Sequence, residues 1–211
     1  MAAVEAGAAA AGGAIESVVF DIGWVLVRLD YRPILEHLAA HGASVRERDV
    51  LMDSIALTEH ECGRMSGHGL LEKLAALAPR APSLAATHAH WINMFEVDAP
   101  MVDLAHRLSE HYRVYLLSNI GDLHWAQLAR EFRLHTLGHG ALPSYVAGCM
   151  KPHADIYAQA ERRFALDPAA TVFIDDRADN IAAARERGWH GIVHRDYAGT
   201  RAALRALAVR C

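Results

Sequence analysis

The sequence predicts an α/β fold, a Rossmann-like and doubly wound parallel sheet that carries a small helical cap inserted after its first strand. Short runs of β-branched and aromatic residues alternate with helical patterns, which is typical of parallel strands joined by helices. One long stretch after the first run holds helical patterns without a convincing strand. We therefore divide the chain into a core of residues 15–30 and 98–211 and a cap of residues 31–97.

The first strand is predicted at Ser17–Asp21, a short apolar run that ends in a carboxylate and is typical of a buried parallel strand. Residues 1–14, before it, are almost entirely Ala and Gly. We expect them to form a disordered extension, because a signal peptide has a basic start and a strongly apolar centre. Similar apolar runs predict three more strands, at Arg113–Ser118, Thr171–Asp175 and, more weakly, Gly191–His194.

The cap is predicted from amphipathic patterns, among them Pro33–Ala40, Leu70–Leu77 and Leu84–Phe95. We interpret Gly138–Gly140 as a flexible turn, because its spacing is not that of a phosphate-binding loop. Between and after the later strands, helical patterns predict the helices of the core: Met101–His111, Asp122–Phe132, Ala154–Phe164 and Asp179–Arg187.

The composition is that of an ordinary folded protein, since 53% of the 211 residues are hydrophobic and 22% are charged. A formal net charge of −4 indicates no basic face for nucleic acid. The apolar runs are too short to cross a bilayer, so we expect no membrane partner. The three scattered cysteines form no metal-binding pattern, and we expect free thiols in the reducing cytoplasm. None of these features bears on the oligomeric state.

Polar residues stand where the predicted strands end, and ligands of open parallel sheets bind outside those ends. Each group alone has an ordinary structural explanation as a cap, a turn or a solvated loop. Together they are what phosphoryl transfer to aspartate needs: a carboxylate nucleophile, further carboxylates for Mg²⁺, a hydroxyl and a lysine for the phosphate. The groups are Asp21, Ser118-Asn119, Lys151 and Asp175-Asp176.

Four segments, in this order, resemble motifs one to four of the haloacid dehalogenase superfamily. They are Phe20-Asp21-Ile22-Gly23, Leu117-Ser118-Asn119, Met150-Lys151-Pro152 and Phe173-Ile174-Asp175-Asp176, with Asn180 four residues on. The resemblance extends from about Ser17 to His194 and is greatest to small capped phosphatases such as the bacterial α-D-glucose-1-phosphate phosphatase. It implies a hydrolase that uses Mg²⁺ to act on a small phosphorylated metabolite, such as a sugar phosphate, through an aspartyl-phosphate.

The resemblance also implies a role for each matching residue. The cap would close over the substrate and exclude water. Ser118 and Asn119 would hold the phosphate, and Lys151 would neutralise both the phosphate and Asp21. Asp21 would be the nucleophile and a metal ligand, together with the carbonyl of Gly23 and the carboxylate of Asp176. Asp175 and Asn180 would orient the metal's ligands and waters.

The sequence departs from the superfamily pattern after the nucleophile. Most of these phosphatases have an Asp two residues after the nucleophile, and this Asp serves as general acid and base. This chain instead has Gly23 at that position, followed by Trp24. Loss of such a group slows a reaction by roughly 10²- to 10⁴-fold. Trp24 could form a wall of the substrate pocket or pack under the cap.

Two alternatives follow from these departures. A metal-independent 2-haloacid dehalogenase also lacks the second Asp, although the paired acids Asp175 and Asp176 favour phosphate. A catalytically weak domain that binds a phosphorylated metabolite or a protein partner is the other alternative. Only Gly23 and Trp24 support it, and the intact cluster of charges argues against it.

Overall fold

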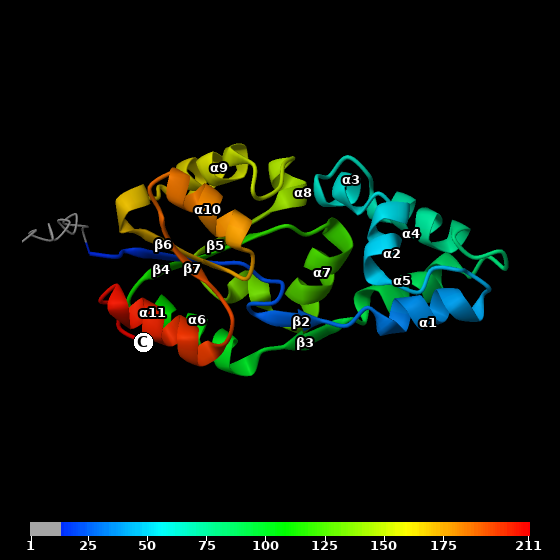
Figure 1. Ribbon diagram of the computed structural model, residues 1–211, viewed down its shortest axis with the longest axis horizontal. Helices are drawn as coiled ribbons and strands as arrows, with labels where there is room; N and C mark the ends of the chain where they lie inside the picture. Colours follow the sequence, from blue (N-terminus) through cyan, green and yellow to red (C-terminus); the bar gives the residue numbers. More distant parts are fainter. Residues whose placement is uncertain (1–13) are drawn as a thin grey trace, which may run out of the picture.

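The computed structural model describes residues 14–211, so the predicted disordered extension lies, but for Ala14, outside the described residues. The core is a five-stranded parallel sheet of order β5-β4-β1-β6-β7, and this confirms the predicted fold class (Figure 1). Its central strand is β1 (Ser17–Phe20), flanked by β4 (Arg113–Ser118) and β6 (Thr171–Asp175). The edges are β5 (Gly140–Pro143) and β7 (His190–Val193).

The central strand is buried on both faces, because its alternating side chains enter two separate apolar layers. Val18 and Phe20 pack with α6 (Ala99–Ser109), α7 (Asp122–Glu131) and α11 (Tyr197–Ala206). On the opposite face, Val19 packs with α9 (Ala154–Phe164) and α10 (Ala178–Glu186). Figure 1 shows these two helical layers above and below the sheet. The four predicted core helices are all present, with ends that differ from the prediction by at most two residues.

The interpretation of Gly138–Gly140 as a flexible turn is correct only in part, because residues 138 and 139 form a bend but Gly140 does not belong to it. Gly140 begins the edge strand β5, which pairs with β4 in parallel register. Gly138 lies against that neighbouring strand, where a Cβ would come 2.4 Å from the carbonyl oxygen of Val114. Gly138 allows the two backbones to approach closely. The strand β5 has only four residues and begins with a glycine, so it gives little apolar pattern.

A second small sheet, which the sequence did not predict, joins the cap to the core. Its strands β2 (Val27–Leu29) and β3 (Phe95–Val97) pair in antiparallel fashion. The prediction that residues 31–97 contain no convincing strand is therefore wrong. The helix predicted over Leu84–Phe95 is also too long, since α5 (Leu84–Ile92) ends earlier. An alternating apolar and polar pattern cannot be recognised in strands of only three residues.

Five helices lie between these two strands and form the cap at the right of Figure 1. They bury a separate apolar cluster that includes Ile34, Leu51, Leu74 and Trp91. The division into domains at residues 31 and 97 stays a prediction. The helices are α1 (Arg32–Ala40), α2 (Arg48–Ser54), α3 (Leu57–Glu61), α4 (Gly67–Ala76) and α5.

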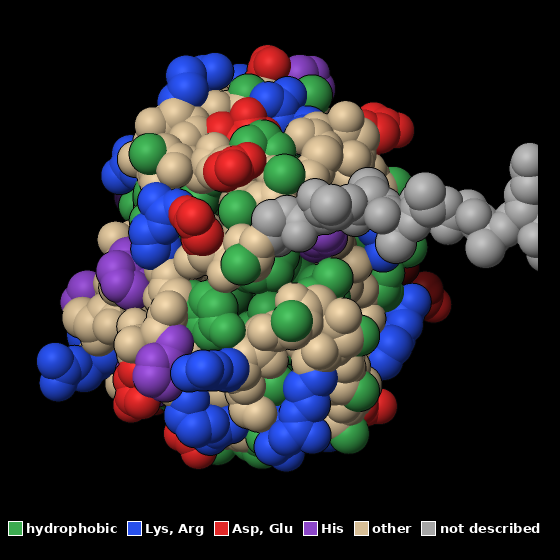
Figure 2. Space-filling model, turned by 90° about the vertical axis from the view of Figure 1, so that its left-hand side faces the viewer, with side chains coloured by type: hydrophobic (Ala, Val, Ile, Leu, Met, Phe, Trp, Pro, Cys, Tyr) green, Lys and Arg blue, Asp and Glu red, His purple; other side chains and the backbone are tan. Residues whose placement is uncertain are grey.

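The surface shown in Figure 2 carries basic and acidic side chains interspersed with each other. Within the described residues, every helix is too short or too polar to span a membrane. A short helix, α8 (Ser144–Ala147), follows β5 and leads into the loop before α9. This loop and the carboxyl ends of the three central strands face the cap.

Candidate active site

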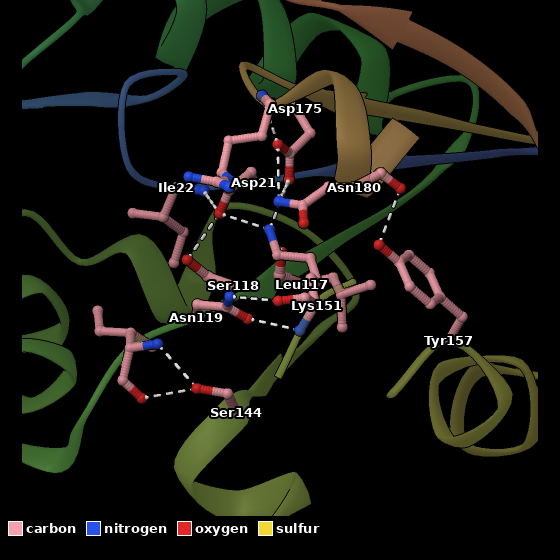
Figure 3. Close-up of polar contacts among 12 residues, drawn as sticks. Asp21, Ile22, Leu117, Ser118, Asn119, Ser144, Lys151, Tyr157, Asp175 and Asn180 are labelled. Carbon is pink, nitrogen blue, oxygen red and sulfur yellow. Dashed lines mark hydrogen bonds and ion pairs between the residues drawn. The ribbon is translucent and has the colours of Figure 1, made fainter. Parts of the chain in front are cut away.

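The sheet register brings the predicted site residues to one edge. Phe20 of β1 pairs with Leu116 of β4 and with Ile174 of β6, so the three strands end side by side. Asp21 follows β1 directly, while Ser118 and Asp175 are the last residues of β4 and β6. Figure 3 shows these side chains pointing toward one another.

Asp21 has one engaged and one free carboxylate oxygen. Oδ1 accepts hydrogen bonds from the Ile22 amide at 2.6 Å and the Ser118 hydroxyl at 2.7 Å, and it lies 3.0 Å from Lys151 Nζ. Within residues 14–211, Oδ2 accepts none. Burial raises the pKa of Asp21 to about 7; the Lys151 charge opposes this rise and the Asp175 charge adds to it. The free oxygen is therefore available to a cation or an electrophile.

Lys151 is a buried cation shared by two carboxylates. Its Nζ donates to Asp175 Oδ2 at 2.7 Å and to the Leu117 carbonyl at 2.9 Å, besides its contact with Asp21. Burial alone would lower the pKa of Lys151, but the two carboxylates raise it above its ordinary value. Its predicted place at a strand end is wrong, because it lies in the loop after α8. The side chain nevertheless reaches the predicted cluster.

The side chain of Asn119 holds the backbone of Lys151. Its Oδ1 accepts from the Lys151 amide at 2.8 Å, and its Nδ2 donates to the Lys151 carbonyl at 2.9 Å. Asn119 also lines the cavity at the site. The amide side chain thus fixes the position of the lysine, and its role in holding phosphate stays a prediction.

The two consecutive acids have different surroundings. Asp175 is fully buried, and its oxygens accept from Lys151, from the Arg177 amide at 2.8 Å and from Asn180 Nδ2 at 3.0 Å. Asp176 is half-buried, and its carboxylate accepts no hydrogen bond from another residue within residues 14–211. Asp176 does not cap α10, since the residue before that helix is Arg177. Burial, followed by the Asp175 charge, raises the pKa of Asp176.

The donor set fits a divalent cation with hard oxygen ligands. Ligand atoms of Asp21, Asp175 and Asp176 all lie within 4.8 Å of one another. Asp175 already has its hydrogen bonds, whereas Asp21 Oδ2 and the Asp176 carboxylate are free. The buried Oδ1 of Asn180 also has no partner within the described residues. Carboxylates gathered this closely repel one another, and Mg²⁺ is the kind of ion that one or two of them bind.

A cavity of about 440 Å³ opens above this cluster and extends under the cap. All of the predicted site residues line it except Asp175, which is fully buried. Trp24 lines it too, with 47% of its surface exposed and a left-handed φ of 59°. The first of its two predicted places, a wall of the pocket, is confirmed.

Three cap residues of the cavity wall were not found from the sequence: Arg48, Leu57 and Glu61. They lie on short helices and belong to no motif. Only the folding of α2 and α3 over the strand ends brings them to the site.

Comparison with protein-family profiles matches residues 15–188 to the haloacid dehalogenase-like hydrolases. A D-ribitol-5-phosphate phosphatase from Bacteroides thetaiotaomicron is 28% identical over 186 residues, covering 83% of this chain and 89% of that protein. A sesquiterpene phosphatase from Aspergillus oryzae is 25% identical over 194 residues, covering 91% and 96%.

Solved structures show the same similarity. A haloacid dehalogenase family enzyme from B. thetaiotaomicron, in complex with magnesium and inorganic phosphate, has a TM-score of 0.78 at 26% identity, covering 86% of this chain and 94% of that chain. The L-2-haloacid dehalogenase from Xanthobacter autotrophicus has a TM-score of 0.60 at 16% identity, covering 91% and 83%. At that identity the similarity shows the fold alone.

Proposed function

The chain belongs to the haloacid dehalogenase-like hydrolase family, and we propose that it is a magnesium-dependent phosphatase of small phosphorylated metabolites. The reaction passes through an aspartyl-phosphate on Asp21. One observation carries the proposal: Asp21 keeps a free oxygen beside the buried Lys151 and the unengaged Asp176.

The residues of the site divide the chemistry between them. Asp21 Oδ2 attacks phosphorus, and the Asp21 carboxylate is held for that attack by the hydrogen bonds on its other oxygen. Lys151 places a compact positive charge beside both the nucleophile and the phosphoryl group. Asp21, Asp176 and the Gly23 carbonyl would hold Mg²⁺, whose charge would screen the repulsion between carboxylate and phosphate.

The substrate class is supported by the cavity and by the relatives. A volume of about 440 Å³ lies within the range of pockets for small metabolites. The cavity wall is mixed, with the aromatic rings of Trp24 and Tyr31 beside the charges of Arg48 and Glu61. The relatives named above act on a polyol phosphate and on a sesquiterpene phosphate. Specificity for α-D-glucose 1-phosphate stays a prediction.

A screen of phosphorylated metabolites, with and without Mg²⁺, tests this function by measuring phosphate release. We expect chelator to abolish release and Mg²⁺ to restore it. Hydrolysis of 2-haloacids in chelator would support a dehalogenase instead. If Mg²⁺ binds but no ester is cleaved, the protein is a binding domain and the proposal fails.

Asp176→Asn is expected to weaken Mg²⁺ binding by at least about 10- to 100-fold, because it removes a free carboxylate from the cluster. Isothermal titration with Mg²⁺ measures this without any substrate. Asp179→Asn is the matched control, since Asp179 is exposed on α10 and pairs with Arg177. Equal Mg²⁺ affinity in the two variants would remove Asp176 from the metal site.

Trp24→Ala and Trp24→Gly are both expected to raise the KM of the best substrate by about fivefold, which corresponds to an aromatic contact of about 1 kcal/mol. The glycine variant should be more stable than the alanine variant by about 1 kcal/mol, because glycine adopts the φ of 59° without strain. Steady-state kinetics and thermal unfolding measure the two effects. An unchanged KM in both variants would mean that the ring does not contact substrate.

A further inference from the structure

The proposed reaction needs a proton that residue 23 does not supply. When the phosphorus–oxygen bond of the ester breaks, the departing oxygen carries negative charge unless an acid protonates it. Gly23 has no side chain, so the proton must come from elsewhere in the cavity. The inference below rests on the proposed phosphatase function.

Glu61 is a carboxylic acid that the proposed chemistry leaves unused. It is the last residue of α3 and lines the same cavity as Asp21. Within residues 14–211 its carboxylate has no hydrogen-bond or ion-pair partner. Burial, followed by the charge of Asp21, raises the pKa of Glu61 to about 7, and the charges of Arg48 and Lys151 oppose this rise.

The backbone of Glu61 is fixed to the catalytic core. Its carbonyl accepts a hydrogen bond from the Ser144 hydroxyl at 2.6 Å. The same hydroxyl accepts at 2.9 Å from the amide of Ile120, two residues after Ser118. The acid is thus tied to the loop that follows β4.

Two glycines bring the cap and the core into close contact around α3. A Cβ on Gly121 of the core would come 2.1 Å from Nε2 of the neighbouring His60. A Cβ on Gly63, just after α3, would come 2.4 Å from the Tyr145 carbonyl oxygen. Only glycine permits these contacts, so α3 packs closely against the core. Glu61, at the end of α3, lines the cavity.

We propose that Glu61 is the general acid and base of this enzyme and takes the place of the group missing at Gly23. In the first step, Asp21 Oδ2 forms a bond to phosphorus while the ester bond breaks, and the protonated Glu61 gives its proton to the departing oxygen. In the second step, the Glu61 carboxylate takes a proton from water. The water oxygen bonds to phosphorus and the bond to Asp21 breaks, releasing phosphate and restoring both side chains.

The cavity also allows the missing acid to be restored. A Cβ on Gly23 would meet only the Leu29 side chain, at an ordinary contact distance of 3.5 Å. Gly23→Asp therefore fits as far as its first carbon, and it offers a second route for the proton. The double variant Gly23→Asp/Glu61→Gln is accordingly a rescue experiment.

Glu61→Gln tests the proposal with two esters, p-nitrophenyl phosphate and a small alkyl phosphate, in the full chain with saturating Mg²⁺. For the alkyl ester, kcat/KM should fall by about 10²- to 10⁴-fold, because its alkoxide leaves poorly without a proton. The p-nitrophenolate leaves well unaided, so its first turnover should stay fast. Its later turnovers should slow, giving a burst of about one p-nitrophenolate per site and a phosphorylated enzyme that accumulates.

The matched control is Glu59→Gln on the same helix, where Glu59 is exposed and pairs with Arg64; it should show neither effect. The Gly23→Asp rescue should restore part of the alkyl rate and remove the burst. If Glu61→Gln lowers kcat/KM equally for both esters, without a burst, the residue is structural and the proposal fails. Absence of phosphate release from the unaltered protein would instead overturn the phosphatase function itself.

Discussion

Asp21→Asn is expected to lower phosphate release by at least about 10⁴-fold while the protein stays folded. The substitution keeps the shape of the side chain but removes the attacking oxygen's charge and one metal ligand. Because burial raises the pKa of Asp21 to about 7, its negative charge opposes folding at neutral pH in the absence of metal. In chelator, the Tm of the variant should therefore equal or exceed that of the unaltered protein.

Kinetics with the best substrate and thermal unfolding in chelator measure these two effects. Asp103→Asn, an exposed position on α6, serves as the control and should change neither the rate nor the Tm. Full turnover in the purified Asp21→Asn protein would remove Asp21 from the mechanism. A large loss of Tm would show that the carboxylate supports the fold, contrary to its surroundings in the structure.

Lys151→Met is expected to abolish activity and also to destabilise the protein by about 3–5 kcal/mol. The lysine is fully buried between Asp21 and Asp175, and its loss leaves two buried carboxylates without their cation. Burial already raises the pKa of Asp21, and loss of the opposing Lys151 charge would raise it further, so the variant would bind a proton on folding. The stability deficit should be largest near neutral pH and shrink as the pH falls.

Urea unfolding in chelator at several pH values measures this deficit. The sequence holds only one other lysine, Lys73, which is exposed on α4, so Lys73→Met is the matched control. Adding Asp175→Asn to Lys151→Met should recover part of the stability, because it removes one unpaired charge. A deficit that is independent of pH and unaffected by Asp175→Asn would mean that Lys151 contributes packing alone.

The strongly patterned parts of the fold follow from the sequence. The central strands β1, β4 and β6 are continuous apolar runs, and the core helices have long amphipathic patterns, so both could be predicted. By contrast, β2 and β3 have only three residues each, and β5 is the short run Gly-Ala-Leu-Pro, so these strands carry too little apolar pattern. Their positions depend on pairing with a partner strand that is distant in the sequence.

The same contrast holds at the candidate site. Asp21, Ser118 and Asp175 could be placed together because parallel strands end at one edge. The engagement of the Asn119 side chain with Lys151 depends on a loop conformation that no strand or helix pattern encodes. Glu61 comes from the cap, and only the packing of α3 against Ser144 brings it over the cavity. Residues supplied by such packing are not visible in a motif.

The most direct test of the central claim is to identify the phosphorylated residue. The protein, mixed with substrate and Mg²⁺, is quenched during turnover and reduced with borohydride, which converts an aspartyl-phosphate to homoserine. Peptide mass spectrometry then locates the change, and Glu61→Gln, in which the intermediate should accumulate, gives the larger signal. We expect homoserine at position 21 and nowhere else. Phosphate release with an unmodified Asp21, or with the reduced residue at another position, would contradict the account.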